Sequence, residues 1–210
     1  MEPQAIHSQA LPTAVEPLSA EPSDEQLVKA AQAGDTRAFD VLVRKYQRRA
    51  VAVSYRLLGS SHDALEVTQD AFLKAFGSIA TIHKPEAFGG WLMRIVANLS
   101  LNYRRSRKSR NQLPLDDLLG PSDGQSDSGS EWMARNVDPA HGMESREMGG
   151  RLQEALAKLP EKQRQAIVLF TIEEWPQKEI AQSLECSVEA VKWHVFQARK
   201  KLKELMKDYL

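Results

Sequence analysis

Apolar residues recur at spacings of three and four along most of this chain, a period that predicts helices rather than strands. The stripe of the last helix comprises Val188, Val191, Val195, Ala198, Leu202 and Leu205. A shorter helix before it has its packing face at Ile180, Ala181 and Leu184, and residues 185–187 separate the two. Ser187 can cap the second helix by accepting a bond from a first-turn amide. Residues 179–210 are therefore predicted to form a helix-turn-helix, which can enter a DNA groove.

Four further helices are predicted between residues 23 and 110. A capping box at Ser23 opens the first, and Gly34 follows its end. Gly59 ends the second helix, Ser61 restarts the pattern, and Pro85 suits the first turn of the fourth. The apolar positions of helices two to four are Phe39, Leu42, Val43, Tyr46, Ala50, Val53, Leu57, Leu65, Phe72, Phe76, Phe88, Trp91, Leu92, Ile95 and Leu99.

Helical periodicity is lost between residues 111 and about 140, where Gly, Ser, Asp and Pro dominate. It resumes near Met143 and continues to Pro160, and Ile167 to Phe170 then form a core helix. No alternating strand pattern and no repeat is present. The chain is predicted to be all-α, with two small helical domains joined by a flexible acidic linker. Its parts are a disordered tail (1–22), a first domain (23–110), the linker (111–147) and a second domain (148–210).

Charge is distributed unevenly, although the 210 residues have a formal net charge of zero. Residues 1–25 hold five acidic residues and no Lys or Arg, whereas residues 104–110 hold five basic ones. Residues 111–148 contain eight acidic and two basic residues, a net charge of minus six. Basic modules joined by acidic connectors are compatible with nucleic-acid binding, which the neutral total alone would disfavour.

Several classes of protein do not fit the sequence. No apolar stretch reaches the roughly 18 residues of a membrane span, and no signal peptide is evident, so a cytoplasmic protein without membrane insertion is expected. The single cysteine, Cys186, excludes an internal disulfide, and the histidines lack metal-ligand spacing. The run from Phe88 to Trp91 is no phosphate loop, and no catalytic triad is suggested. We expect neither an enzyme nor a cofactor or metal.

Cations and aromatics occupy the non-core faces of the last helix. One interpretation is a bundle helix with a solvated basic face, but Trp193 and Phe196 favour an interface because exposed aromatics are costly unless something covers them. Lys and Arg side chains suit phosphates, whereas His and Gln side chains can reach base edges. The candidate groove contacts are Lys192, Trp193, His194, Phe196, Gln197 and Arg199.

Residues 79–110 combine aromatic and basic side chains, which suits unpaired DNA because splayed bases need a flat surface and the backbone needs cations. The alternative makes Phe88, Trp91 and Tyr103 core aromatics and the arginine run a solvated helix end. We favour the core interpretation for Phe88 and Trp91, and phosphate contact for the arginines. The acidic face at Asp63, Glu66 and Asp70 fits either solvated charges or docking of a basic partner helix.

Two separate motifs resemble the extracytoplasmic-function group of the sigma-70 family, the smallest bacterial initiation sigma factors, across about residues 23–210. DALEVTQDAFLKAF at 63–76, FGGWLMRIVAN at 88–98 and the pair Arg104 and Arg105 resemble conserved region 2. Leu159 and Pro160, EIA at 179–181, VK at 191–192 and AR at 198–199 resemble region 4. The order and separation of the two motifs are specific, and the acidic linker between them is typical of the minimal group.

The resemblance implies a sigma factor that binds core RNA polymerase, directs it to promoters and initiates DNA melting. The surface that docks on the clamp helices of the largest polymerase subunit would comprise Asp63, Glu66, Gln69 and Asp70. The −10 contacts would be Ile82, His83 and Lys84, around a flipped base, with Asn98, Asn102, Arg104 and Arg105 at the strand-separation point. Region 4 would place its recognition helix in the −35 major groove. Promoter DNA, both duplex and single-stranded, is thus an expected partner, and control by an anti-sigma factor is common in the group.

The chain departs from the family pattern at two positions. The recognition helix has AVKWH at 190–194 where a Thr-Val-Lys-Ser-Arg-like run is usual, so promoter sequence does not transfer. Thr68 replaces a usually aliphatic residue of the docking helix. The rival functions are a stand-alone helix-turn-helix regulator, which needs a dimer seam or effector pocket, and a helical adaptor for acidic proteins, which a shallow salt dependence of DNA binding would reveal.

Overall fold

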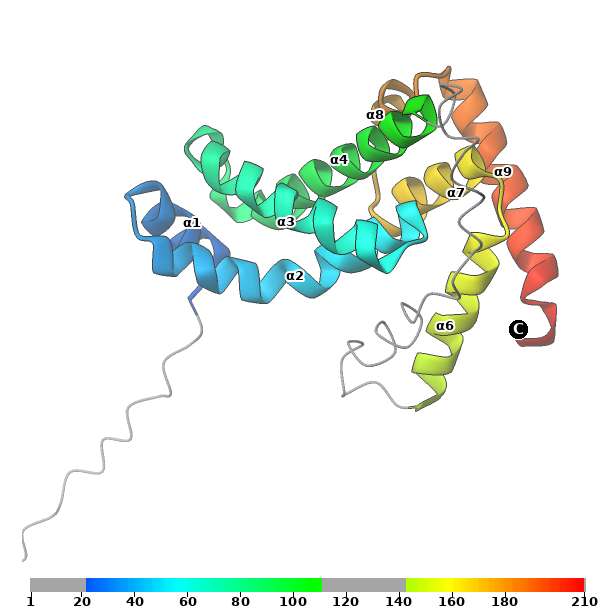
Figure 1. Ribbon diagram of the computed structural model, residues 1–210, viewed down its shortest axis with the longest axis horizontal. Helices are drawn as coiled ribbons and strands as arrows, with labels where there is room; N and C mark the ends of the chain where they lie inside the picture. Colours follow the sequence, from blue (N-terminus) through cyan, green and yellow to red (C-terminus); the bar gives the residue numbers. More distant parts are fainter. Residues whose placement is uncertain (1–21, 111–142, 210) are drawn as a thin grey trace, which may run out of the picture.

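The computed structural model describes residues 22–110 and 143–209, and within them it contains helices and turns but no strand (Figure 1). The predicted all-α architecture of two small helical domains is confirmed. The predicted N-terminal tail, and the predicted linker apart from residues 143–147, lie outside the described residues. No described helix combines the length and apolarity that crossing a bilayer requires.

The first domain is a bundle in which the long helices α2, α3 and α4 pack together, with α1 across one end. Ser23 forms the predicted capping box with Gln26, and Gly59 ends α2 at a φ of 79°, a left-handed conformation that suits glycine. Its elements are α1 (Asp24–Gln32), α2 (Thr36–Leu58), α3 (Ser61–Ser78), η1 (Ile79–Thr81), η2 (Pro85–Ala87) and α4 (Phe88–Arg110).

The core of this domain contains the predicted apolar stripes of α2 and α4, whereas the stripe of α3 is only partly buried. Phe88 is fully buried and Trp91 packs against the core, as the core interpretation requires. Leu65, Phe72 and Phe76 share one side of α3, as their spacing predicts, but only Phe72 is buried, and Leu65 and Phe76 are 40% and 46% exposed. Small residues of α3 face the bundle instead and permit close packing: Ala64, Val67, Ala71 and Ala75.

The second domain contains the predicted helix-turn-helix, formed by α8 and α9. The turn places Glu185 at a φ of 51°, and the Ser187 hydroxyl accepts a bond from the Ala190 amide at 3.1 Å, which confirms the predicted cap. The expected core helix at 167–170 continues past Ile167 as a π-helical segment. The elements are α6 (Met143–Ala157), α7 (Glu161–Ile167), η4 (Val168–Ile172), α8 (Gln177–Ser183), α9 (Val188–Leu205) and η5 (Lys207–Tyr209).

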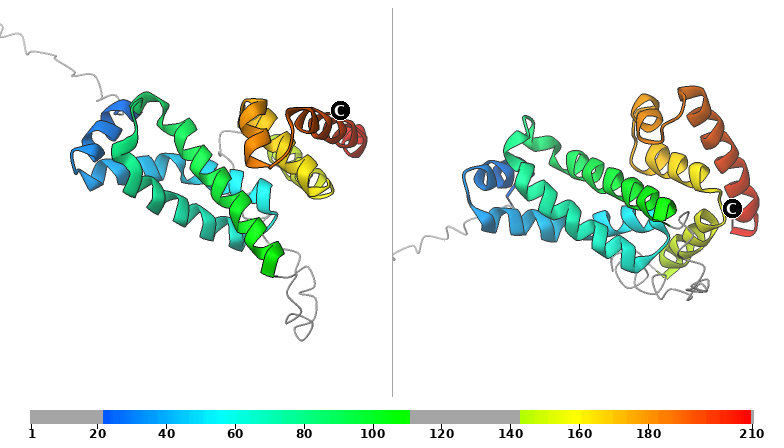
Figure 2. Two further views of the ribbon diagram at one scale, coloured as in Figure 1. Left: turned by 90° about the horizontal axis from the view of Figure 1, so that it is seen from above. Right: turned by 45° about the horizontal axis from the view of Figure 1, so that its top comes forward.

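The two domains lie against each other, with α2 contacting α6, α7 and η4. In the views of Figure 2, α8 lies near the C-terminal half of α4, and α9 forms the outer edge of the second domain. Arg94, Asn98 and Arg105 of α4 contact α8.

Candidate nucleic-acid interface

The recognition helix α9 exposes most of the residues predicted to enter a DNA groove. The Trp193 and Phe196 side chains are 54% and 65% exposed, which is high for large aromatics. Lys192 and Arg199 are also exposed, and the Arg199 guanidinium lies 5.5 Å from the centre of the Phe170 ring. A basic helix with uncovered aromatic rings has the chemistry to bind phosphates and apolar base edges together.

His194 and Gln197 are half-buried and turn partly toward the protein. The His194 ring lies edge-on to Trp193 with ring centres 5.1 Å apart, and its buried Nδ1 has no hydrogen-bond partner. Burial, and then the positive charge of Lys162, lower the pKa of His194 below its ordinary 6.5. The lowered pKa favours the neutral imidazole, which can serve as a hydrogen-bond donor or acceptor.

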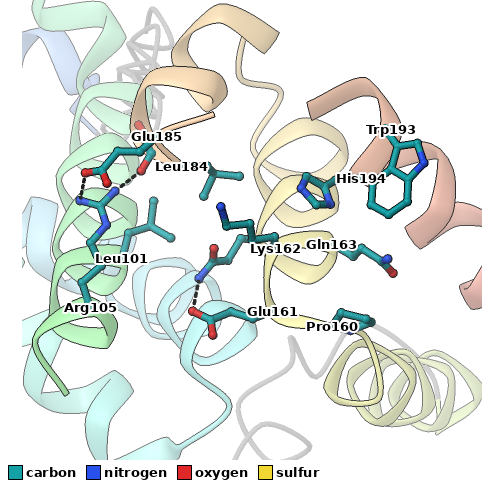
Figure 3. A pocket seen from close by; sticks show the side chains of 12 residues that line it. Leu101, Arg105, Pro160, Glu161, Lys162, Gln163, Leu184, Glu185, Trp193 and His194 are labelled. Carbon is teal, nitrogen blue, oxygen red and sulfur yellow. Dashed lines mark hydrogen bonds and ion pairs between the residues drawn. The ribbon is translucent and has the colours of Figure 1, made fainter. Parts of the chain in front are cut away.

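A cavity of about 580 Å³ lies between α4, α7 and the helix-turn-helix. Figure 3 shows Arg105 on one side of it, His194 and Trp193 on the other, and Lys162 between them. The cavity thus joins the predicted strand-separation residues of the first domain to the recognition helix of the second.

The loop predicted to receive a flipped base exposes only part of its predicted set. Ile82 is 8% exposed and belongs to the core, and its carbonyl accepts a bond from the Gln32 side chain at 3.1 Å. Its side chain is therefore directed into the bundle. His83 and Lys84 remain exposed and are the members of the set that can meet a base or a phosphate.

The four residues predicted at the strand-separation point lie in the C-terminal half of α4: Asn98, Asn102, Arg104 and Arg105. Each of them forms a hydrogen bond or an ion pair within the protein. Arg104 donates to the carbonyls of Leu57 and Leu58 at 3.0 and 3.1 Å and pairs with Glu161 at 2.9 Å. It thereby caps the C-terminus of α2, where a cation is stabilised by the helix dipole.

Arg105 extends toward the helix-turn-helix. It donates to the Ser183 carbonyl, pairs with Glu185 at 3.1 Å and donates to Asn102 at 3.2 Å. Asn98 accepts a bond from the Ser183 hydroxyl at 3.3 Å. The predicted single-strand surface and the second domain thus meet directly.

The acidic residues predicted to dock on polymerase divide into two sets. Asp63 is 8% exposed and accepts bonds from Tyr103, at 2.9 Å, and from Arg107, so it holds α3 to α4. Burial, followed by the bond to Asp63, raises the pKa of Tyr103. Gln69 and Asp70 are exposed and free to face a partner.

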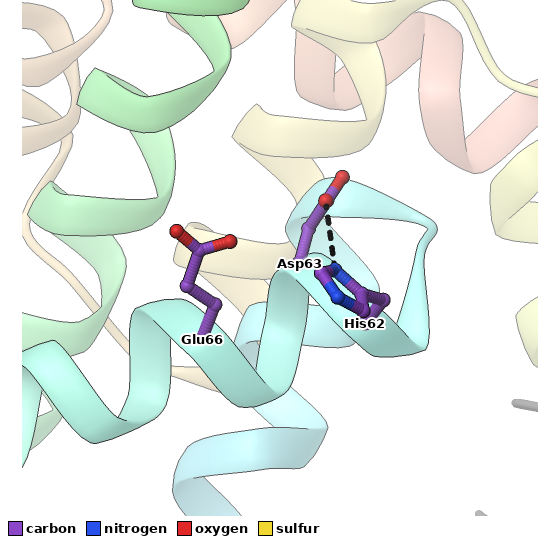
Figure 4. Close-up of side chains that lie close together, drawn as sticks. All are labelled: His62, Asp63 and Glu66. Atoms are coloured by element: carbon purple, nitrogen blue, oxygen red, sulfur yellow. Dashed lines mark ion pairs between the residues drawn. The ribbon is translucent and has the colours of Figure 1, made fainter.

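Glu66 is exposed and lies 3.4 Å from the Tyr103 hydroxyl. Figure 4 shows Glu66, His62 and Asp63 close together, with His62 Nδ1 3.8 Å from an Asp63 oxygen. These three side chains are of the types that ligate metals. Both Asp63 oxygens already bind Tyr103 or Arg107, so the cluster is explained by the α3–α4 network and gives no reason to add a metal.

An apolar groove on α2 and α3 was not anticipated from the sequence. A cavity of about 630 Å³ lies over these helices, and Leu73 at its edge is 71% exposed. Phe76 packs edge-on against Phe39 with ring centres 5.0 Å apart. Leu65, Phe72 and Phe76, whose spacing predicts one shared side of the helix, all line the groove. The groove is also lined by Gln69, one of the predicted docking residues.

Comparisons with known proteins agree with this arrangement of two domains. Residues 42–110 match the family model described as sigma-70 region 2, and residues 149–202 match that described as sigma-70 region 4. The chain is 30% identical over 187 residues to the RNA polymerase sigma-H factor of Pseudomonas aeruginosa, covering 89% of this chain and 95% of that protein. It is 32% identical over 181 residues to the ECF RNA polymerase sigma factor SigW of Bacillus subtilis, covering 86% and 95%.

Solved structures with a similar fold include CnrH in complex with the cytosolic domain of CnrY. The TM-score is 0.50 at 28% identity, over 89% of this chain and 99% of that chain. The sigma factor RpoE in complex with the anti-sigma factor NepR from Bartonella quintana matches with a TM-score of 0.52 at 19% identity, over 82% of this chain and 98% of that chain.

Proposed function

Because this chain belongs to the extracytoplasmic-function group of the sigma-70 family of RNA polymerase sigma factors, we propose that its two domains divide promoter recognition between them. A sigma factor binds core polymerase, directs it to promoters and initiates melting; it is not an enzyme. One observation supports these separate roles. The second domain exposes a basic and aromatic face on α9, and the first domain has an apolar groove on α2 and α3. The stand-alone regulator is not favoured, since the relatives named above are sigma factors.

The first domain would dock on the clamp helices of the largest polymerase subunit through the groove on α2 and α3. Leu73 and Phe76 supply exposed apolar surface there, and Gln69 and Asp70 lie beside it on the exposed side of α3. A helix laid in such a groove buries apolar area while polar groups at the rim fix its orientation. Glu66 remains exposed at the same helix, whereas Asp63 would act indirectly by holding α3 to α4.

Promoter contacts would be shared between the domains. In the second, Lys192 and Arg199 would bind −35 phosphates, and Trp193, His194, Phe196 and Gln197 would face the major groove. In the first, His83, Lys84 and the outer half of α4 would bind the opened −10 strand. The polymerase and the promoter place this activity in the cytoplasm.

An anti-sigma factor is a further proposed partner. CnrH, a structural neighbour at 28% identity, was solved with the cytosolic domain of CnrY. An anti-sigma segment that covers the groove on α2 and α3 would compete with polymerase for the same apolar residues.

The experiment that tests this function is transcription from genomic fragments by purified core enzyme, with start sites mapped by sequencing transcript ends. We expect discrete starts only when this protein is added. Leu73→Glu should lower core affinity at least ten-fold, because a charge would replace an apolar side chain that docking buries. Val41→Glu, at an apolar residue with 38% exposure outside the groove, is the matched control. Tight duplex binding without core, and no core-dependent starts, would support the stand-alone regulator instead.

A second arm separates the DNA-binding domain from the docking domain. Lys192→Ala should weaken promoter binding by the holoenzyme about five- to ten-fold without changing core affinity. Lys203→Ala, which removes the same charge in the last turn of α9, should change neither.

A further inference from the structure

Among the described residues, ion pairs between the two domains all have the same polarity. An arginine of the first domain meets a glutamate of the second in each of them: Arg49–Glu173, Arg94–Glu179, Arg104–Glu161 and Arg105–Glu185. The second domain therefore presents an acidic face to the basic face of α2 and α4. This face is distinct from the basic surface of α9.

The acidic face contacts the part of α4 proposed to bind opened DNA. Arg94, Asn98, Asn102 and Arg105 are spaced by four, four and three, which places them along one side of the helix. Arg94 donates to both Glu179 oxygens at 3.1 Å, from Nε and from a terminal nitrogen. Such two-pronged binding is the geometry with which arginine also recognises a phosphate.

The C-terminal end of α8 supplies further hydrogen-bonding groups to α4. Arg105 donates to the Ser183 carbonyl at the C-terminus of α8, which carries partial negative charge, and pairs with Glu185 in the next turn. The Ser183 hydroxyl donates to Asn98 at 3.3 Å. Carboxylates and a carbonyl thus accept from the arginines that DNA phosphates would otherwise satisfy.

We infer that α8 and the turn after it, residues 177–187, occupy the single-strand surface of α4 in the free protein as a substitute for the DNA backbone. The inference rests on the proposed role of α4 in binding the opened strand. It adds that the first helix of the helix-turn-helix is an internal competitor for that strand, so the two domains must separate before α4 can bind DNA.

The contact between α8 and α4 is weak enough to be reversible. The Arg94 and Glu179 side chains are 50% and 40% exposed, and those of Arg105 and Glu185 are 46% and 73% exposed. Pairs with this much access to water contribute little individually and are screened by salt. A ligand with many phosphates, or docking on polymerase that moves the second domain away, can therefore displace them.

The test compares two full-length variants with the same change of charge. Glu179→Arg replaces the carboxylate that binds Arg94, whereas Glu204→Arg changes an exposed residue near the end of α9 without a described inter-domain pair. The probe is a fluorescein-labelled oligothymidine, read by anisotropy without polymerase, and X-ray scattering reports the radius of gyration. We expect Glu179→Arg to bind about five-fold more tightly than Glu204→Arg, the factor that one exposed ion pair contributes, and to be more expanded.

Equal affinity of the two variants would overturn the inference. A third variant, Glu179→Arg with Arg105→Ala, should lose the gain; if the gain persists although the molecule is expanded, α8 does not mask a DNA surface and the inference also fails. A different result would show that α4 does not bind the opened strand as proposed. In that case Arg105→Ala alone would support the same level of transcription with core enzyme as the unchanged protein. Should Glu179→Arg lose its helical circular dichroism, Glu185→Arg at the more exposed site replaces it in the same comparison.

Discussion

Gly89 shows how one atom controls packing where α4 passes α2. A Cβ at this position would lie 2.8 Å from the Tyr46 hydroxyl oxygen and 2.9 Å from Tyr46 Cε1. Tyr46 cannot move freely, because it donates a hydrogen bond to Asp24 and packs edge-on against Phe88 with ring centres 5.5 Å apart. We expect Gly89→Ala to lower the free energy of unfolding by about 1–2 kcal/mol in urea titrations, since overpacking outweighs the better helix propensity of alanine.

The neighbouring glycine provides the control. No atom lies within 4 Å of a Cβ built at Gly90, so Gly90→Ala should raise the free energy of unfolding by up to about 1 kcal/mol. Burial, and then the bond to Asp24, raise the pKa of Tyr46 to about 12, and an ultraviolet titration of Gly89→Ala should show it closer to 10. If Gly89→Ala and Gly90→Ala both raise the free energy of unfolding, the Tyr46 side chain can move away from the added methyl group without loss of stability.

At the scale of elements, the attachment of α3 to α4 depends on Asp63. Its carboxylate binds Tyr103 and Arg107 while 8% exposed, and it lies in the first turn of α3, where negative charge is favourable. We expect Asp63→Ala to lower the free energy of unfolding by about 1–3 kcal/mol, because the Tyr103 hydroxyl loses its acceptor. Asp70→Ala, at an exposed position of the same helix, should change it by less than about 0.5 kcal/mol.

The same variants test the assignment of the docking surface. Asp63→Ala should weaken core binding only as far as it unfolds the first domain, whereas Asp70→Ala should leave stability intact. A loss of core affinity by Asp63→Ala at full helicity and unchanged unfolding free energy would restore Asp63 to the contact surface and contradict the indirect role.

The helices and their caps could be predicted because their signals are local. Ser23, Gly59 and Ser187 each act within a turn of their own position, and the apolar period of α9 is uninterrupted. The burial of Asp63 could not be predicted from the sequence, because its partners Tyr103 and Arg107 lie 40 and 44 positions away on another helix. A polar residue on a helix has the same pattern whether water or a distant tyrosine satisfies it.

The π-helical segment η4 was missed for a related reason. Val168–Ile172 is apolar except for Thr171, and its sequence fits an ordinary helix equally well. Its wider turn ends with the Glu173 amide bonding to the Val168 carbonyl, which places the Glu173 carboxylate against α2. The groove on α2 and α3 was visible as a stripe, but periodicity does not say whether an apolar stripe meets the protein's own core or a partner.

At the scale of the whole molecule, the contact between domains combines ion pairs with two further arginines, Arg164 and Arg56, that are withdrawn from water. Arg164 of α7 is 6% exposed and donates to the Leu57 carbonyl at 3.3 Å, and burial, followed by the charge of Arg104, lowers the pKa of Arg164 to about 10. Burial also lowers the pKa of Arg56, which Glu173 partly offsets. The interface therefore contains more cationic than anionic groups, and each glutamate within it reduces the repulsion between arginines.

Glu173 is the carboxylate most dependent on this interface. Its side chain is 1% exposed, binds Arg49 at 3.2 Å and offsets the charge of Arg56. We expect Glu173→Gln to loosen the domain contact and to lower the free energy of unfolding by about 2 kcal/mol, less than for a fully buried pair because Arg49 is half-exposed. Hydrogen exchange should quicken in the second half of α2 and in α7 together, since both lose the same contact.

The adjacent residue supplies the comparison that isolates the interface. Glu174 is exposed, so Glu174→Gln removes the same charge without touching Arg49 or Arg56 and should leave exchange and stability unchanged. If the two variants behave alike, the domain contact does not depend on the buried carboxylate. If exchange quickens in Glu173→Gln only within η4, the π-helical segment is stabilised locally and the two domains separate by themselves in the free protein.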